Sequence, residues 1–393
     1  MIRLGIIGCG RRIGSFVSES LAKAAPDCRV VGIIDPDQTK ALAKLTREED
    51  KKAIFYSTLD EMIKNAKPDA LLIGTRCNLH TPYAIEAAKY GLPLFLEKPV
   101  SVSMEQALAL EAEYLKYPGT PVLVSFPLRF TPQHIRTKEM LQNGAVGDIL
   151  QINGLNYVAY GVGYYEEGYR DYDVTQGLFL QKATHDFDYM MDLAGSRITR
   201  ISATWIRGRV FGGDRPADLF CSKCPDSRTC EESPENRRRH GTSGRTVDHA
   251  CVFSSACGSA DTDINEEASS SIFEMENGAI GNYTQVVFTR REGIRGPIIS
   301  GPRGTISFDW YKPNIHFVES HRPYTSDITV ASGDDHFGGD IELACNFVDM
   351  IRTGAKPLTT LADGMRSVYT CLAAREAAKT NRWVDVRKTE LPQ

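Results

Sequence analysis

A glycine turn follows directly on a short, largely apolar run at the start of the chain. The run spans residues 2–7, and Gly8 and Gly10 come straight after it. Apolar side chains then recur at helical spacing, which predicts a strand, a tight turn and a helix. In such a unit the glycines let the backbone approach a pyrophosphate, whose charge is met by N–H groups at the helix start. The opening of the chain therefore predicts a dinucleotide-binding fold.

A second apolar run, residues 30–34, ends in Asp35. An acidic residue about 20 positions beyond the glycine turn accepts hydrogen bonds from an adenosine ribose and repels a 2′-phosphate, so Asp35 favours NAD over NADP. Ile13 stands where a third glycine is usual, and Gly14 follows it, so we expect a slightly remodelled turn. The cofactor contacts predicted from this segment are Gly8, Gly10, Arg11, Arg12, Ile13 and Asp35.

Alternating strand and helix signals continue to about residue 124, which predicts a parallel, doubly wound sheet of the Rossmann type. The chain has 393 residues, enough for two domains. We predict an NAD-binding domain over residues 1–124 and a substrate and oligomerisation domain over 125–393. Alternating patterns predict further strands at 149–158, 198–206, 268–275 and 279–287, with Asn277-Gly278 as a hairpin turn, and helices at 341–353 and 363–380.

Charge and hydropathy narrow the class of protein. The formal net charge of −4 gives no electrostatic reason to expect nucleic acid or an anionic membrane as a partner. The first apolar run is too short to span a membrane and continues into the glycine turn, which leaves no room for a signal peptide. We therefore expect a cytoplasmic protein that acts on a small molecule.

Two later segments, each following a predicted strand, carry a family resemblance. Residues 74–80 read Gly-Thr-Arg-Cys-Asn-Leu-His, and residues 95–99 read Phe-Leu-Glu-Lys-Pro. Both resemble the glucose–fructose oxidoreductase, inositol dehydrogenase and rhizopine-catabolism family, usually written Gfo/Idh/MocA. The resemblance extends through residues 129–132, 144–147, 185, 336–340 and 363–364, and so covers nearly the whole chain.

The resemblance implies a particular architecture and a set of cofactor contacts. Members have a Rossmann domain followed by a C-terminal α/β domain with an open, largely antiparallel sheet. They also form homo-oligomers, so a dimer or tetramer is expected. The cofactor-binding residues implied in the two quoted segments are Thr75, Asn78, His80, Glu97 and Lys98.

Lys98 and His185 are the predicted catalytic residues. The Glu-Lys-Pro motif is similar to the one that carries the family's catalytic lysine, and Lys98 ends a predicted strand, at the edge where doubly wound sheets bind ligands. An ammonium group there can polarise a substrate hydroxyl and stabilise developing alkoxide charge. His185 matches the family's histidine on a predicted helix, and an imidazole can take the hydroxyl proton or return it.

The sequence departs from the best-known family pattern one helical turn before the histidine. That pattern has an aspartate where this chain has Gln181, and an amide can orient a hydroxyl but cannot take a proton. Asp186 or Asp188 could supply a carboxylate and Lys182 a second cation, although a solvated helix face accounts for these residues equally well. The substitution weakens any transfer of substrate from inositol dehydrogenases.

Six tyrosines are concentrated between residues 157 and 172. A tyrosine offers a flat apolar face for the C–H surface of a sugar ring and a hydroxyl for polar recognition. The segment therefore predicts a carbohydrate site, with packing at a subunit or domain interface as the open alternative. Arg129 resembles a family arginine at the domain junction, where its role could be structural. The substrate-binding set is Lys98, Arg129, Tyr160, Gln181, Lys182, His185 and Asp188.

Five of the ten cysteines crowd between residues 221 and 257, in a polar insertion near 215–260. A Cys-x-x-Cys arm with further cysteines is common in tetrahedral zinc sites. Some family members resemble this chain in having such an insertion. Structural zinc and free thiols both remain open, with an iron–sulfur cluster less favoured, and a closed thiolate site would take no part in hydride transfer. The preferred ligands are Cys221, Cys224, Cys230 and Cys251.

These patterns together predict an NAD-dependent oxidoreductase. It would move hydride to or from a secondary hydroxyl carbon of a sugar, sugar derivative or cyclitol. A redox-neutral glycosidase or epimerase that passes through a transient keto-sugar is the first alternative. A non-catalytic NAD-binding regulator is the second, because a fold does not by itself imply a function. The presence of both Lys98 and His185 favours an enzyme.

Overall fold

The computed structural model describes residues 1–166, 168–241, 246–258, 263–331, 333 and 335–392. The chain forms two compact units, each built from segments distant in sequence. The first unit takes residues 1–135, 332–369 and 388–393, and the second takes 136–331 and 370–387. In the described ranges, every helix is too short or too polar to cross a membrane.

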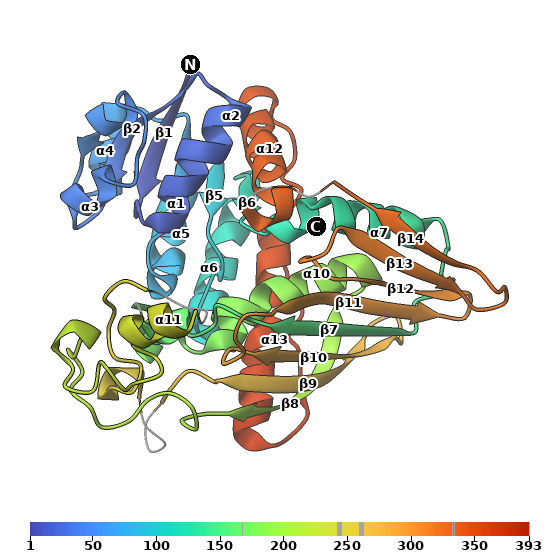
Figure 1. Cartoon of the computed structure of the whole chain (residues 1–393). Helices are drawn as coiled ribbons and strands as arrows, with labels where there is room; N and C mark the ends of the chain where they lie inside the picture. Colours follow the sequence, from blue (N-terminus) through green and yellow to red (C-terminus); the bar gives the residue numbers. More distant parts are fainter. Residues whose placement is uncertain (167, 242–245, 259–262, 332, 334, 393) are drawn as a thin grey trace. The chain divides into compact units, whose positions relative to one another are not determined.

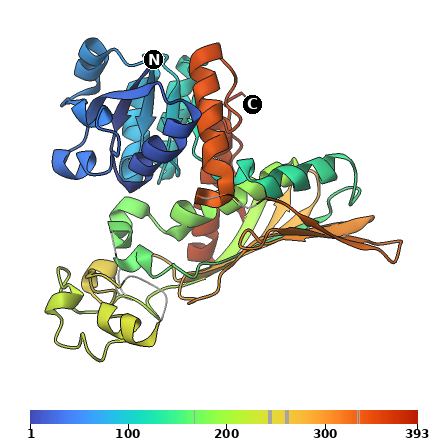
Figure 2. The same cartoon turned by 45° about the horizontal axis from the view of Figure 1, so that its top comes forward.

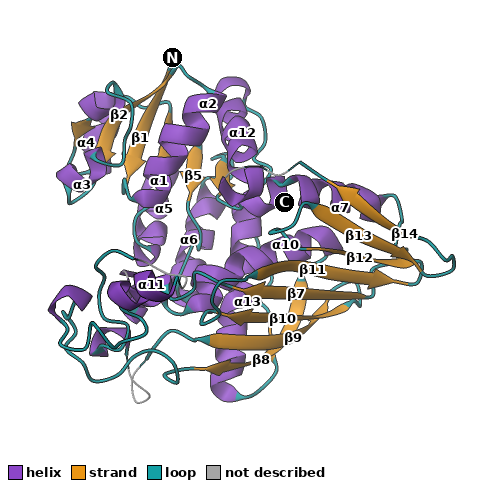
Figure 3. Cartoon of the chain, in the orientation of Figure 1, coloured by secondary structure: helices purple, strands orange, loops and turns teal. Residues whose placement is uncertain are grey.

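The first unit contains a six-stranded parallel sheet with the strand order β3-β2-β1-β4-β5-β6 (Figures 1 and 3). This strand order is that of a dinucleotide-binding fold. Successive strands are added on one side of β1 up to β3 and on the other side from β4 to β6, so the order reverses between β1 and β4. The predicted doubly wound sheet is therefore confirmed. The strands are β1 (Ile2–Ile7), β2 (Cys28–Ile34), β3 (Ile54–Phe55), β4 (Ala70–Ile73), β5 (Leu94–Leu96) and β6 (Val122–Val124).

Helices cover this sheet, and their side chains explain where several of them begin. Thr58 and Ser103 cap two of the helices by accepting backbone N–H bonds with their hydroxyls. The helical elements are α1 (Arg11–Ser15), the π-helical turn η1 (Phe16–Leu21), α2 (Ala22–Ala24), α3 (Gln38–Leu42), α4 (Leu59–Ala66), α5 (His80–Ala88), α6 (Met104–Lys116) and α12 (Gly339–Thr353).

Helix α12 belongs to the core of the first unit, although it lies more than 200 residues beyond the sheet in sequence (Figures 1 and 2). The ring of Phe95 on β5 stacks on Phe16 with centroids 4.3 Å apart and meets Phe347 of α12 edge-on at 5.7 Å. Leu343 and Phe347 are fully buried in this cluster. The helix expected over residues 341–353 thus packs its apolar stripe on the first sheet, although it follows the predicted boundary at residue 124.

The second unit contains a nine-stranded sheet with the order β14-β13-β12-β11-β7-β10-β9-β8-β15. All neighbours run antiparallel except β7 and β10, which confirms the predicted largely antiparallel sheet. The strands are β7 (Gln151–Tyr157), β8 (Ile198–Ile206), β9 (Ala268–Met275), β10 (Ile280–Val286), β11 (Ile294–Gly301), β12 (Gly304–Phe308), β13 (Asn314–Glu319), β14 (Thr325–Thr329) and β15 (Val384–Asp385).

Helix α10 (Thr184–Ala194) packs against β7, and a π-helical segment, η6 (Phe179–Ala183), leads into it. Between β8 and β9 the chain makes a long excursion that includes α11 (Pro234–His240). The other helices are α7 (Pro132–Gln142), α8 (Gly163–Glu166), α9 (Tyr172–Thr175) and α13 (Leu361–Thr380).

Candidate functional site

The glycine turn lies at the point where the strand order of the first sheet reverses. Gly8 follows β1 with φ +80, and a Cβ there would lie 2.6 Å from the backbone N and Cα of Thr75, which follows β4. Only glycine fits both the positive φ and the close approach. The turn and the loop after β4 are therefore in close backbone contact at the carboxyl edge of the sheet, where doubly wound folds bind nucleotides.

The remodelled turn has a simple packing explanation. Ile13 is fully buried, and a Cβ on Gly74 would lie 2.0 Å from its Cγ1, so the isoleucine fills space that Gly74 leaves open. Gly14 provides the close approach instead, since a Cβ there would lie 2.4 Å from the Cβ of Lys44. The side chain of Ile13 is therefore committed to the core, and only its backbone remains for a cofactor contact.

Asp35 connects the end of β2 to the glycine turn. One carboxylate oxygen accepts the backbone N–H of Cys9 and the other that of Asp37, both at 2.9 Å. The side chain is partly exposed at the same edge of the sheet. It is therefore fixed in orientation by the backbone while keeping lone pairs for a further donor such as a ribose hydroxyl.

Arg12 is the centre of a buried ion network. Its Nε donates to Glu97 at 2.9 Å, and its two terminal nitrogens donate to Asp340 of α12 at 2.7 Å each. Burial by itself raises the pKa of Asp340, but a hydrogen bond with His336 and the charge of Arg12 hold it well below its usual range. The side chains predicted to contact the cofactor at 12 and 97 thus bind each other, whereas Arg11 is exposed.

His80 joins the two loops that carry the family motifs. One ring nitrogen lies 2.8 Å from the carbonyl oxygen of Pro99, and the other lies 3.1 Å from that of Thr75. Burial lowers the pKa of His80. The ring therefore holds the loop after β4 against the loop after β5, in which Lys98 is partly exposed.

Two observations fit a dinucleotide at this edge. The first is the open space beside Gly10, where a Cβ would have, of the atoms that the structure describes, only the carbonyl oxygen of Gly74 within 4 Å, at 3.9 Å. The second is Asn78, whose buried Oδ1 has no hydrogen-bond partner among the described residues. A buried amide oxygen without a partner costs stability unless a ligand or water satisfies it. The predicted residues Gly8, Asp35, Asn78, His80 and Lys98 are thus gathered along one edge of the first unit.

The second unit carries the other group of predicted residues. Gln181 and Lys182 lie in η6, and His185 lies in the first turn of α10. Their exposed fractions are only 5%, 4% and 6%. The Nζ of Lys182 donates to the hydroxyl of Tyr160 at 2.6 Å. Helical spacing therefore places a buried amide, ammonium and imidazole within about one turn of each other.

Asp186 is committed to the sheet. Its carboxylate accepts hydrogen bonds from Asn156 of β7 at 2.8 Å, Tyr283 of β10 at 2.9 Å and Arg295 of β11 at 2.9 Å. Neither Asp186 nor Asp188, which is 1% exposed, lies on a solvated face. The solvated-face interpretation of these two residues and of Lys182 is therefore wrong, because all three side chains are buried and Asp186 binds three strands of the sheet.

The tyrosine segment divides into packing and accessible members. Tyr165 is fully buried, with its ring 4.2 Å from that of Phe211 and its hydroxyl donating to the carbonyl of Asn265. Tyr164 is also buried, whereas Tyr160 is 52% exposed. The segment thus packs against the insertion through Tyr165 and presents three tyrosines at the surface, since Tyr157 and Tyr169 are each 38% exposed.

Arg129 lies in the first unit, where it forms an ion pair with Asp363 at 3.2 Å. Asp363 also accepts hydrogen bonds from Thr360 and Arg366 at the start of α13. This contact is structural, as the sequence analysis had allowed.

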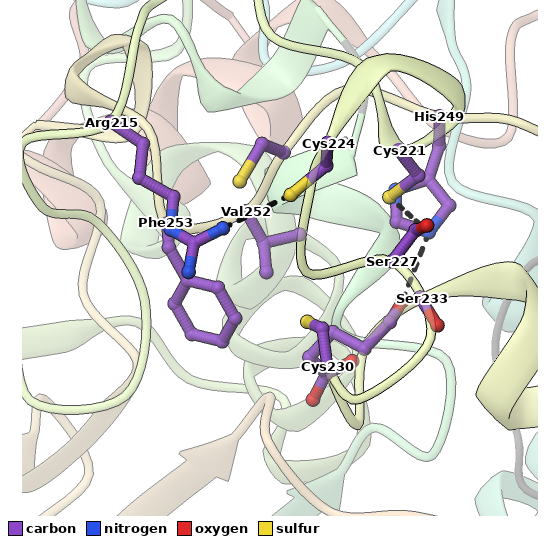
Figure 4. A pocket seen from close by; sticks show the side chains of 11 residues that line it. Arg215, Cys221, Cys224, Ser227, Cys230, Ser233, His249, Val252 and Phe253 are labelled. Atoms are coloured by element: carbon purple, nitrogen blue, oxygen red, sulfur yellow. Dashed lines mark hydrogen bonds between the residues drawn. The ribbon is translucent and has the colours of Figure 1, made fainter.

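The predicted zinc ligands line one small cavity, shown in Figure 4. Its volume is about 10 Å³, which is the space of one water-sized occupant. Arg215 donates to the Sγ of Cys224 at 3.1 Å, and His249 lies 3.7 Å from the Sγ of Cys221. Across the described ranges, however, no three His, Cys, Asp or Glu side chains form a group that could hold a metal ion. The cavity lining includes Cys221, Cys224, Cys230, His249 and Cys251.

Several residues of these networks escaped the sequence analysis. Asp340 lay in a segment of family resemblance, but nothing in the sequence connected it to Arg12. Arg295 and Tyr283 carry no local signal, because their partner Asp186 lies about 100 residues away in sequence.

Comparisons with known proteins agree with this architecture. Residues 2–124 match the model of an oxidoreductase family with an NAD-binding Rossmann fold, and residues 138–386 match the model of its C-terminal alpha/beta domain. The oxidoreductase YteT of Bacillus subtilis is 24% identical over 79% of this chain and 78% of its own length. The inositol 2-dehydrogenase of Corynebacterium glutamicum is 26% identical, over 52% of this chain and 57% of its own length.

Solved structures share the fold. A levoglucosan dehydrogenase in complex with NADH and L-sorbose superposes with a TM-score of 0.77 at 19% identity, covering 99% of this chain and all of its own. An oxidoreductase domain protein from Kribbella flavida gives 0.75 at 16% identity, covering 98% and 99% of the two chains.

Proposed function

Because this chain belongs to the Gfo/Idh/MocA oxidoreductase family, with its NAD-binding Rossmann domain and C-terminal α/β domain, we propose that it oxidises a sugar, sugar derivative or cyclitol. It is an NAD-dependent dehydrogenase by family. The observation that carries the proposal is the edge of the first unit, where the glycine turn at Gly8, the fixed carboxylate of Asp35 and the ammonium of Lys98 follow strands β1, β2 and β5 of one sheet. The relatives named inositol 2-dehydrogenase and levoglucosan dehydrogenase support the substrate class.

The proposed division of labour assigns one task to each side chain. Bound NAD accepts or donates the hydride. Asp35 accepts hydrogen bonds from the adenosine ribose. Lys98 holds the reacting oxygen and stabilises the negative charge that develops there. His185 accepts the hydroxyl proton, and the amide of Gln181 orients the hydroxyl or the imidazole without taking a proton itself.

A substrate panel tests this function. Purified protein would be incubated with NAD and a range of sugars and cyclitols, with NADH formation and product identity measured together. A keto product with an equal amount of NADH supports the proposal. Release or epimerisation of a sugar without net NADH would establish the redox-neutral alternative. NAD binding without turnover of any member would favour the regulator.

Homo-oligomerisation and a cytoplasmic location remain proposals. The first is supported by one face of the second sheet, where register places Ile272 and Ile298 in a single cross-strand row. These side chains are 53% and 39% exposed, and Ile280 on the same face is 55% exposed. Asn282 and Asn153 separate the two isoleucines in that row, so the face is mixed in polarity, and exposed apolar side chains on such a face are common at protein interfaces.

We also propose that the cysteine cavity binds a structural zinc ion. The thiol and imidazole groups that line the cavity support this proposal, and so does its volume, which suits one ion. The described side chains are not arranged in a coordination geometry. Binding would release the thiol protons and draw the sulfurs inward to about 2.3 Å from the metal. Arg215 would offset part of the negative charge of four thiolates through its contact with Cys224.

Metal analysis of the purified protein checks this site. We expect about one zinc per chain, lost in Cys224→Ser and in Cys251→Ser. Cys257→Ser is the matched control, because Cys257 lies in the same insertion but its thiol donates to the carbonyl of Tyr165 outside the cavity lining. Protein that carries no metal after purification and after incubation with zinc would leave the free-thiol interpretation in place.

A further inference from the structure

Lys182 is a buried cation with an accessible partner. The residue is 4% exposed, and its Nζ lies 2.6 Å from the hydroxyl of Tyr160 and 5.0 Å from the centre of that ring. Tyr160 is 52% exposed, so the pair connects the interior of the second unit to its surface. Burying an ammonium group is costly unless it has a strong partner. The pair is therefore a built feature of the fold.

The surroundings of the pair favour a mobile proton. Burial lowers the pKa of Lys182, and the nearby guanidinium of Arg295 acts in the same direction, whereas Tyr160 and Asp186 oppose it. Tyr164 lies beside the ring of Tyr160 with centroids 6.4 Å apart. Tyr311, beyond β12, also lies within electrostatic range of Tyr160. Because burial disfavours the charged form of Lys182, its ammonium depends on the oxygen of Tyr160 as a partner, and a phenolate is a stronger partner than a neutral phenol.

The backbone around Lys182 departs from a regular α-helix. Residues 179–183 form the π-helical segment η6, and such segments occur frequently at functional sites. Lys182 lies near the end of this segment and His185 in the first turn of α10, three residues further along the chain. Gln181, one turn before His185, offers no carboxylate to take a proton.

We propose that Tyr160 and Lys182 form a second acid–base pair of the substrate site, through which the proton taken by His185 leaves for solvent. The inference deepens the proposed function and rests on it. Tyr160 is the proton carrier, and Lys182 is a positioning residue that stabilises its phenolate. The pair supplies the proton acceptor that Gln181 cannot.

The proposed oxidation is balanced in protons and electrons. During oxidation the C–H bond breaks and its electron pair leaves with the hydrogen to NAD. The hydroxyl proton passes to the imidazole of His185 and then to the oxygen of Tyr160, which changes from phenolate to phenol. Because Tyr160 is accessible, the phenol then returns this proton to water and the pair is restored. The sum is alcohol plus NAD⁺ giving ketone, NADH and one proton in solution.

An ultraviolet titration of tyrosine ionisation tests the pair without any substrate. We expect one phenolate signal to vanish in Tyr160→Phe and to move to higher pH in Lys182→Met, with Lys182→Arg close to wild type. Tyr324→Phe is the control, because Tyr324 is also exposed, at 58%, but lies in the turn between β13 and β14. A wild-type titration that Tyr160→Phe and Tyr324→Phe alter in the same way would overturn the inference.

Kinetics with a substrate found in the panel give the second test. Tyr160→Phe should lower kcat by about 100-fold and remove one ionisation from its pH profile. Lys182→Arg should keep more activity than Lys182→Met. If Lys182→Met fails to fold, Tyr160→Phe decides, because phenylalanine keeps the ring. An unchanged pH profile in Tyr160→Phe would refute the pair while leaving the dehydrogenase intact, whereas a silent panel with a normal titration would refute the dehydrogenase alone.

Discussion

Replacing Lys98 by methionine should lower kcat by about 10²–10³-fold, the cost of removing one preorganised group that stabilises developing oxyanion charge. Methionine keeps most of the apolar stem but removes the ammonium from the loop after β5. The loop itself should remain in place, because His80 holds it through the carbonyl of Pro99. NAD affinity should therefore change little, which calorimetry can measure beside steady-state NADH formation.

The matched control for this substitution is Lys89→Met. Lys89 is also in the first unit, but it lies on the surface, 47% exposed, where it pairs with Asp60. Its replacement should leave turnover unchanged. If Lys98→Met kept its activity within a factor of a few, the proposed role of the lysine in stabilising developing oxyanion charge would be refuted.

Replacing Asp186 by alanine should destabilise the protein by about 3–5 kcal/mol, because removal of one partner leaves a buried charge without compensation. The orphaned charge is that of Arg295, which is 3% exposed, and Asn156 and Tyr283 lose their acceptor at the same time. The carboxylate is what fixes α10 to three strands of the sheet. Turnover should therefore fall with stability, since His185 is the neighbouring residue on that helix.

Thermal unfolding of the variants would measure this effect. Asp192→Asn is the control on the same helix, because the pair of Asp192 with the partly exposed Lys138 should contribute at most about 1 kcal/mol. The double variant Asp186→Leu with Arg295→Met should recover much of the lost stability, since replacing a buried ion pair by apolar groups is often nearly neutral. A loss below about 1 kcal/mol in Asp186→Ala would contradict the anchoring role.

The two experiments distinguish a residue that takes part in the reaction from one that stabilises the fold around the site. Lys98→Met should impair turnover in a protein that unfolds at the wild-type temperature. Asp186→Ala should lower both turnover and the unfolding temperature, and the double variant Asp186→Leu with Arg295→Met should restore stability. Activity restored with it would mean that the network acts by positioning α10, whereas activity still missing would indicate that the charges themselves contribute to the substrate site.

The amino-acid sequence by itself determined the features that depend on neighbouring residues. Gly8 and Gly10 after an apolar run, and Asp35 at the end of the next, predicted the dinucleotide-binding fold and its cofactor edge, because turn chemistry and the period of apolar residues act locally. The same local rules located β7 to β10 and the hairpin at Asn277-Gly278. The family resemblance then added Lys98 and His185, whose roles remain predictions.

Only the tertiary structure decided which distant side chains meet. It joined Arg12 to Glu97 and Asp340, committed Asp186 to Arg295, and gave buried Lys182 an accessible partner in Tyr160. It also drew α12 into the first unit through Phe347. Neither periodicity nor propensity encodes such pairs, since each depends on which faces pack together once strands and helices have formed. Burial then makes these contacts matter, because a charge removed from water must find its partner within the fold.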